Sequence, residues 1–168
     1  MSNSYQNMAR AYIAFGANLA NPRDMFLRVV EALAGEGVVI DDASPLYRSP
    51  AWPPGSGAPD YLNAVLSVRT ALEPEALMSL LLEIEGRLGR QRSVPNAPRV
   101  VDLDLVDMPG EVRATAHLTL PHPRMHERDF VLLPLRDVAP DWIGPDGRSV
   151  FHLIEALPSH AATRIAWA

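Results

Sequence analysis

The alternation of apolar and polar residues along the chain predicts short strands separated by amphipathic helices. A first strand is expected at 11–15, where an apolar run ends at Gly16. A helix should follow and end at Gly35, because an Asn-Pro pair of the kind that starts helices precedes apolar residues spaced three and four apart. The residues of this pattern are Asn21, Pro22, Phe26, Val29, Val30 and Leu33.

The pattern continues with two strands, a helix and a strand. A broken strand is expected over 38–48, and the clearest strand lies at 61–69, where side chains of alternating type share two faces. A second helix should run from Pro74 to about Gly89, and a further strand over 100–106. A third helix is expected to begin at Phe130.

This order of elements is the split βαβ pattern of ferredoxin-like α+β folds. We therefore expect a βαββαβ core, in which helices pack on an antiparallel sheet and long loops surround the site. The length of 168 residues suits one domain. We place that domain at 10–168, after a polar and flexible tail at 1–9. The Pro/Gly-rich segment 49–59 is expected to be a surface loop that can act as a lid.

Composition narrows the class of protein. The net charge of -5 disfavours nucleic acid as a partner, because such binding needs a broad cationic surface. No apolar stretch approaches the roughly 20 residues that cross a bilayer, and the N-terminus does not resemble a secretory signal. The absence of cysteine excludes disulfides and thiolate metal sites. We expect a cytoplasmic monomer that acts on small molecules and binds neither nucleic acid nor membranes.

All 15 basic residues are arginine, and the chain has no lysine. P-loop and protein-kinase sites are thereby excluded, since both hold phosphate with a lysine. Any phosphate must be bound by arginine, whose planar guanidinium group makes bidentate contacts. Genomic codon bias is an alternative cause of the missing lysine, and the exclusion holds in either case.

Two carboxylates lie on the predicted strand at 100–106. Asp102 and Asp104 are two residues apart, so both side chains leave one face of the strand, about 6.5–7 Å apart at the backbone. Aspartate is disfavoured in strands and like charges repel, so a bound divalent cation, most naturally Mg²⁺, explains the pair. The alternative is a solvated face of an edge strand.

Several arginines stand close to this pair in the sequence: Arg87, Arg90, Arg92 and Arg99. A metal-bound polyphosphate needs such charges, because its negative charge must be neutralised from several sides. For Arg87 we expect instead ion pairs with Glu83 or Glu85 on the same helix. Glu85 borders the apolar stripe of that helix, where it either faces a site or flanks the core.

Two further groups of residues suggest ligand contacts. Tyr61 and Asn63 share a strand face and offer an aromatic surface beside an amide, which suits a flat heteroaromatic ring, although each also fits ordinary packing. His122 and His126 have the spacing of a helical metal pair, but the proline between them indicates a loop. A phosphate contact by His122 or Arg128 is the favoured interpretation.

Together, the motifs of the chain resemble the 6-hydroxymethyl-7,8-dihydropterin pyrophosphokinase family of the folate pathway. The resemblance is specific because the motifs occur in the family's order and at its spacing. It implies a ferredoxin-like fold and transfer of the β,γ-diphosphate of ATP to the hydroxymethyl group of the pterin, with release of AMP. The matching segments are 12–19, 47–50, 59–64, 84–85 with 89–92, 98–104, and 120–122 with 128–130.

The resemblance also implies roles for individual residues. Asp102 and Asp104 would bind two Mg²⁺ ions and, with Arg90 and Arg92, would form the catalytic group. The pterin ring would stack between Tyr61 and Phe130, and the loops before Tyr61 and after Gly89 would close over the substrates. The residues implied in pterin binding are Ser49, Pro50, Trp52, Tyr61, Asn63 and Phe130. Those implied in ATP binding are Glu85, Arg90, Arg92, Arg99, Leu105, Thr119, His122 and Arg128.

Three features depart from the family pattern and bear on ATP affinity. The tryptophan that is usual before a Gly-Pro-Arg motif is missing from segment 96–99, Pro123 stands where some members have a tyrosine, and His117 stands where some have an arginine. One alternative is therefore a catalytically impaired homologue that binds pterin or nucleotide, although such a protein would have no need for repelling carboxylates. Another is an RNA-binding ferredoxin-like domain, which the acidic charge disfavours.

Overall fold

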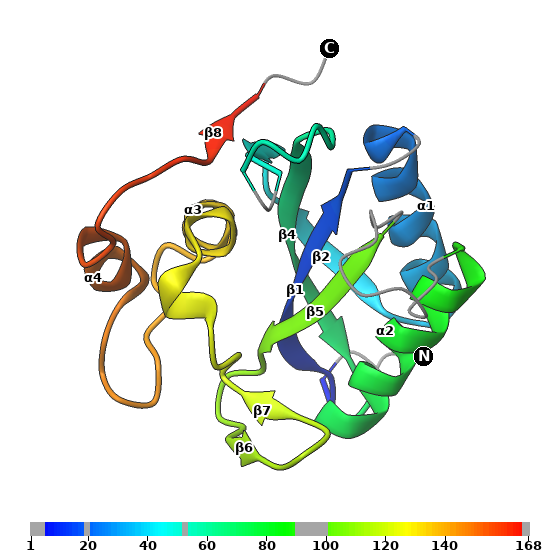
Figure 1. Cartoon of the computed structure of the whole chain (residues 1–168). Coiled ribbons are helices and arrows are strands. Elements are labelled where there is room, and N and C mark those ends of the chain that lie inside the picture. The colour runs from blue at the N-terminus through cyan, green and yellow to red at the C-terminus, as the bar shows by residue number, and fades with distance from the viewer. Residues whose placement is uncertain (1–5, 19–20, 52–53, 90–100, 166–168) are drawn as a thin grey trace.

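The computed structural model describes residues 6–18, 21–51, 54–89 and 101–165. Within these ranges the elements follow the predicted order, with short additional elements after β5 (Figure 1). The elements are β1 (Ala9–Ala17), α1 (Pro22–Gly35), β2 (Val39–Ala43), β3 (Tyr47–Ser49), β4 (Tyr61–Thr70), α2 (Pro74–Arg87), β5 (Asp102–Asp107), β6 (Arg113–Ala114), β7 (Thr119–Leu120), a 3-10 turn (Met125–Glu127), α3 (Asp129–Val138), α4 (Val150–Glu155) and β8 (Thr163–Arg164).

The main sheet has the strand order β5-β1-β4-β3-β8, and β2 also pairs with β4. Every pairing in it is antiparallel. The second strand of the βαββαβ pattern is divided into β2 and β3, as the broken pattern at 38–48 predicted. Because each βαβ crossover leaves room for one strand between its two strands, β1 and β4 become the central neighbours. The expected ferredoxin-like α+β fold is confirmed.

Helices cover both faces of this sheet (Figure 1). On one face, inward side chains of β1 and β4 such as Ile13 and Leu66 join those of α1 and α2, including Leu33 and Leu81, in one buried apolar cluster. On the other face, a second cluster joins Val65 of β4 to side chains of α3 and α4. The sheet therefore forms the middle layer of three, and alternate residues of each strand contribute to different cores.

The start of α1 confirms the predicted capping pair. Asn21 has an extended backbone, and its side-chain oxygen accepts a hydrogen bond from the backbone N–H of Asp24 at 3.2 Å. Pro22 occupies the first turn, where its missing N–H removes no helical bond. The Asn-Pro pair thus fixes where the chain leaves β1 and turns back along the sheet.

The Pro/Gly-rich segment after β3 is a surface loop, as predicted. Gly55 and Gly57 have φ angles of 77° and 76°, a region that disfavours side chains. The loop is connected to the end of β1, because Asn18 donates a hydrogen bond to the Pro59 carbonyl at 3.3 Å. Its action as a lid stays a prediction.

The C-terminal segment returns to the edge of the sheet, which the sequence pattern did not predict. β8 pairs with β3, and the backbone N–H of Ile165 donates to the Leu46 carbonyl at 2.9 Å. One carboxylate oxygen of Asp129, in the first turn of α3, accepts hydrogen bonds from the backbone N–H groups of Ala161 and Ala162, both at 2.7 Å. Asp129 thus ties the C-terminal segment to the start of α3.

None of the helices in the described part of the chain has the length and apolar character that a bilayer crossing requires.

The Asp129 contact predicts a local effect on stability. Asp129→Ala removes a charged acceptor from two backbone N–H groups, so we expect a loss of about 1–2 kcal/mol in unfolding free energy and faster amide hydrogen exchange over 161–165. Asp146→Ala is the control, because Asp146 accepts a backbone N–H in an exposed turn elsewhere. Unchanged exchange at Ala161 and Ala162 in the Asp129 variant would show that this contact does not hold the segment.

Candidate functional site

The register of three strands brings the two aspartates to the face of the sheet that α3 covers. In the β1–β5 pairing, Gly16 lies opposite Asp102 and Ala14 lies opposite Asp104. Both aspartate side chains are half-buried, whereas Leu103 lies in the opposite core at 1% exposure. The predicted common face of the two carboxylates is therefore what the structure shows.

Gly16 forms a gap in the centre of this face. It pairs with Asp102 on one side and with Asn63 of β4 on the other. Opposed residues of antiparallel strands share a face, so Asp102, Gly16 and Asn63 form one row across the sheet. A Cβ atom at Gly16 would lie 3.4 Å from Oδ1 of Asn63. The missing side chain thus leaves space between the aspartates and the amide oxygen of Asn63.

Asn63 is held in place by the neighbouring strand. Its side-chain nitrogen donates hydrogen bonds to Oγ of Ser49 at 2.8 Å and to the Tyr47 carbonyl at 3.3 Å, and the residue is 5% exposed. Ser49 in turn pairs with Tyr61 at the start of β4. Ser49, Tyr61 and Asn63, which the resemblance implies in pterin binding, therefore lie together where β3 and β4 meet. Pro50 follows on an exposed position.

Arg128 and Phe130 approach the same face from the start of α3. The guanidinium carbon of Arg128 lies 5.7 Å from the centre of the Phe130 ring, a distance at which a cation and an aromatic face attract. Nη1 of the same arginine is 4.0 Å from Oδ2 of Asp104. The Arg128 side chain thus lies between Phe130, which the resemblance implies in pterin binding, and Asp104, which it implies as a metal ligand.

Glu85 lies beneath the aspartate strand. It is 1% exposed, and its carboxylate accepts a hydrogen bond from the backbone N–H of Leu103 at 2.7 Å. Leu103 separates the two aspartates, so this bond fixes the backbone between them. The contact of Glu85 with ATP stays a prediction. Arg87 forms the expected ion pair with Glu83, at 3.9 Å, and a closer one with Glu36, the residue that follows α1, at 3.1 Å.

A pocket of about 200 Å³ opens beside Asp104. Four residues implied in metal or ATP binding line it: Asp104, Leu105, Thr119 and His122. Two of the departures from the family pattern, His117 and Pro123, line it as well. The remaining lining residues are Met78, Thr115, Ala116 and Leu118. Sequence reasoning missed these, because Met78 resembles any apolar residue of α2 and the β6–β7 hairpin has only two residues in each strand.

The surroundings of His122 favour its neutral form. Burial, followed by the positive charges of Arg128 and Arg124, lowers the pKa of His122 below the ordinary value of about 6.5. Its Nδ1 accepts a hydrogen bond from the backbone N–H of Arg124 at 3.2 Å. The ring proton is therefore on Nε2, which can donate to a ligand oxygen.

The donor chemistry of the aspartate pair fits Mg²⁺. In the ranges that the structure describes, no group of three or more acidic or histidine side chains is arranged to hold a metal ion. Two hard carboxylates would leave most coordination positions for phosphate oxygens and water, which is how Mg²⁺ is commonly bound at nucleotide sites. β5 is an edge strand of the sheet, but Asp104 lines a pocket there, and this argues against the alternative of a purely solvated face.

The remaining predicted site residues lie outside the described residues: Trp52, Arg90, Arg92 and Arg99. Their roles stay predictions, and so does the effect of the altered segment 96–99.

The fold and the site define an α+β domain with paired carboxylates beside a pocket, and comparison with known proteins identifies its family. The family profile described as 7,8-dihydro-6-hydroxymethylpterin-pyrophosphokinase matches residues 12–140. A 2-amino-4-hydroxy-6-hydroxymethyldihydropteridine pyrophosphokinase of Synechocystis is 37% identical over 158 residues, which are 93% of this chain and 80% of that protein. The enzyme of the same name from Haemophilus influenzae is 33% identical and matches 94% of this chain and 99% of its own length.

The chain therefore belongs to the 7,8-dihydro-6-hydroxymethylpterin-pyrophosphokinase family, and the resemblance inferred from its motifs is confirmed. It is a pyrophosphokinase of folate biosynthesis, in a family that uses ATP as co-substrate, generally with Mg²⁺.

Longer proteins contain the same domain. The folic acid synthesis protein fol1 of Pneumocystis carinii is 37% identical over 160 residues, but this chain covers only 21% of it. The crystal structure of wild-type Plasmodium falciparum HPPK-DHPS matches 88% of this chain with a TM-score of 0.64 at 12% identity, and this chain spans 41% of that one. At so low an identity, the likeness supports the fold alone.

The Glu85 contact yields a prediction about the aspartate strand. Glu85→Ala leaves the buried N–H of Leu103 without its acceptor, so we expect a loss of about 1–3 kcal/mol in unfolding free energy and weaker Mg²⁺-ATP binding. Glu85→Gln retains an acceptor oxygen and should lose less of both. Denaturant unfolding and calorimetric titration with Mg²⁺-ATP measure the two effects. Equal behaviour of the Ala and Gln variants would contradict a role for this hydrogen bond.

Proposed function

We propose that this site transfers the diphosphate of ATP to the hydroxymethyl group of 6-hydroxymethyl-7,8-dihydropterin, with two Mg²⁺ ions at Asp102 and Asp104. The observation that carries the proposal is the row formed by Asp102, Gly16 and Asn63. The Asp102 carboxylate and the Asn63 amide share one face in this row, separated by a residue without a side chain, and this supports a metal site beside a pterin site. A hydroxyl group held at Asn63 would thus lie close to a phosphate held at the aspartates.

The pocket beside Asp104 would hold one end of ATP. Its volume of about 200 Å³ is below the roughly 300–1,000 Å³ of pockets that enclose a drug-sized ligand. It is therefore too small for the whole of ATP, and we assign it to the nucleoside part, with the phosphates extending past Asp104 towards Arg128. There Arg128 would supply positive charge, and Nε2 of His122 would donate a hydrogen bond to a phosphate oxygen.

The pterin would lie on the other side of Gly16. Oδ1 of Asn63 lies towards Gly16 and can accept from a ring N–H, because the amide nitrogen is already engaged with Ser49 and Tyr47. Tyr61 and Phe130 would stack on the two faces of the ring. The guanidinium group of Arg128, which lies against the Phe130 ring, would then be between the two substrates.

The reaction requires in-line attack by the pterin hydroxyl on the β-phosphorus of ATP, which is surrounded by negatively charged phosphate oxygens. The pterin hydroxyl oxygen bonds to the β-phosphorus of ATP as the bond from that phosphorus to the oxygen of AMP breaks, and the hydroxyl proton is released. Bound Mg²⁺ supplies charge neutralisation and lowers the pKa of an oxygen that it coordinates. The protein side chains orient both substrates, and Arg128 shares the charge of the diphosphate. Closure of the Pro/Gly-rich loop would keep water from accepting the diphosphate.

We further propose that the protein works as a cytoplasmic monomer on these two small molecules, without a nucleic acid or membrane partner. The net charge of -5 supports the exclusion of nucleic acid.

The proposal is tested by AMP release in the presence and absence of the hydroxymethylpterin. We expect AMP only when ATP, Mg²⁺ and the pterin are all present. Asp102→Asn and Asp104→Asn should each lower kcat by about 10²–10³-fold, because each removes charge that stabilises the transition state. Asp146→Asn, which alters a carboxylate in an exposed turn, should retain full activity.

Two results would contradict the proposal. Tight binding of ATP and pterin without AMP formation would identify the chain as a catalytically impaired homologue. Undiminished turnover in both aspartate variants would refute the metal assignment.

A further inference from the structure

The β6–β7 hairpin forms one wall of the pocket beside Asp104. Residues 115–119 of this hairpin line the pocket, and Met78 of α2 lines it from another element. Two segments that are far apart in the sequence thus contribute to one cavity. The size and shape of the pocket depend on how these segments are placed relative to each other.

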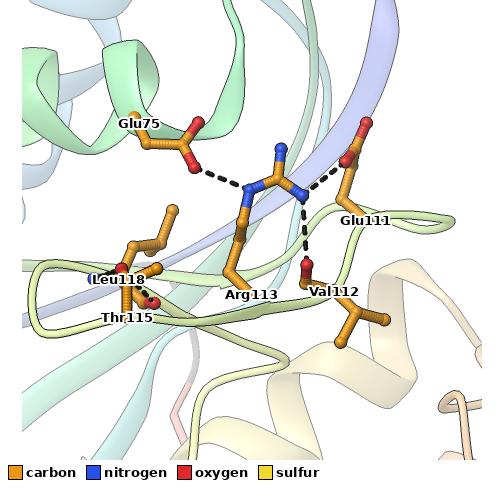
Figure 2. A network of polar contacts seen from close by, with 6 residues as sticks. All are labelled: Glu75, Glu111, Val112, Arg113, Thr115 and Leu118. Atoms are coloured by element: carbon orange, nitrogen blue, oxygen red, sulfur yellow. Dashed lines mark hydrogen bonds and ion pairs between the residues drawn. The ribbon is translucent and has the colours of Figure 1, made fainter.

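Arg113 connects the two segments (Figure 2). It lies on β6, and its Nε donates a hydrogen bond to Oε1 of Glu75 at 2.6 Å. Glu75 is in the first turn of α2, three residues before Met78, so the contact reaches the same end of the helix that lines the pocket. Arg113 is not among the residues that line the pocket, so its influence on a nucleotide would be indirect.

The same guanidinium group also fixes the approach to the hairpin. Nη1 of Arg113 donates to Oε2 of Glu111 at 2.8 Å and to the Val112 carbonyl at 3.0 Å. The side chain of Arg113 is only 25% exposed, whereas that of Glu75 is 53% exposed. Arg113 is therefore the inner member of a three-part network, and the two carboxylates hold it from opposite sides (Figure 2).

The turn of the hairpin is stabilised by its own contacts. The hydroxyl and the backbone N–H of Thr115 both donate to the Leu118 carbonyl at 3.0 Å, and the N–H of Leu118 donates back to the Thr115 hydroxyl at 3.1 Å. On its inner side, Leu118 belongs to the apolar cluster that also contains residues of α2. The turn of the hairpin is thus closed by its own hydrogen bonds, and the Arg113–Glu75 contact connects the hairpin to α2 at the surface.

We propose that Arg113 is a positioning residue for the nucleotide, which sets the separation between α2 and the β6–β7 hairpin and thereby the affinity of the pocket for ATP. This inference rests on the proposed function, because it takes the pocket to be the ATP site. Half-exposed ion pairs contribute little to global stability, so removal of Arg113 should affect the pocket more than the fold.

The test compares Arg113→Met, which keeps much of the apolar stem, with Arg113→Lys, which keeps a charge but loses the planar fork. The Kd of Mg²⁺ with the non-transferable analogue α,β-methylene-ATP is measured by calorimetry on the full chain, beside KM and kcat. We expect Arg113→Met to raise the Kd of the analogue and the KM of ATP roughly three- to tenfold. The KM of the pterin and kcat at saturating ATP should change less than twofold, and Arg113→Lys should show an intermediate effect.

Two further variants separate positioning from loss of charge. Glu75→Gln should reproduce part of the effect, and its combination with Arg113→Met should be no worse than Arg113→Met alone, because both changes break the same contact. Arg148→Met is the matched control, since Arg148 pairs with Asp146 at 2.8 Å in an exposed turn that does not line the pocket. It should leave the Kd of the analogue unchanged.

The inference is overturned if Arg113→Met leaves the Kd of the analogue unchanged. It is also overturned if the KM values of ATP and pterin rise together with a fall in melting temperature, which is the signature of general damage. The proposed function fails separately: a wild-type protein that forms no AMP, yet binds the analogue in a manner dependent on Arg113, would retain the positioning role while refuting catalysis.

Discussion

The site depends on the alternation of side chains across three paired strands. Because successive residues of a strand face opposite sides, the register that buries Ile13, Leu66 and Leu103 against α1 and α2 also directs the residues between them to the other face. Asp102, Gly16 and Asn63 share that face for this reason alone. A shift of one residue in the pairing of β5 with β1 would move both aspartates into the apolar core. The energy that drives core formation therefore also specifies the site.

Buried and half-buried polar groups on both faces of the sheet are tolerated here because each has a defined partner or an opening beside it. Glu85 is buried but bonds to the backbone between the aspartates, and Asn63 is buried but donates to Ser49. The aspartates themselves stay half-exposed, and Asp104 lines a pocket, so the pair avoids the cost of burying like charges together. The start of α3 adds Arg128 within 4.0 Å of Asp104. The face packed against α1 and α2 thus supplies the apolar core, and the face towards α3 carries the charged residues of the site.

Periodicity was sufficient to predict β1, α1, β4, α2 and β5, because each is long enough for its apolar pattern to be distinctive. Periodicity also predicted that Asp102 and Asp104 share one face, because the apolar residues between and after them mark the strand clearly. β6, β7, α4 and β8 are short elements whose positions are set by tertiary contacts such as those of Arg113 and Asp129. The pocket wall at Met78 could not be predicted either, since a helix pattern gives the buried face but not the segment that packs beside it. The roles of individual residues came from the family resemblance rather than from periodicity.

The central claim is that Asp102 and Asp104 together hold the metal ions that bind the triphosphate. The most direct test is a crystal structure with Mn²⁺ in place of Mg²⁺, α,β-methylene-ATP and the hydroxymethylpterin, in which anomalous scattering locates the metal. The account predicts two Mn²⁺ peaks coordinated by the carboxylates of Asp102 and Asp104 and by phosphate oxygens, with the pterin beyond Gly16 at Asn63. Metal peaks elsewhere, or both carboxylates directed into solvent while the nucleotide is bound, would contradict it.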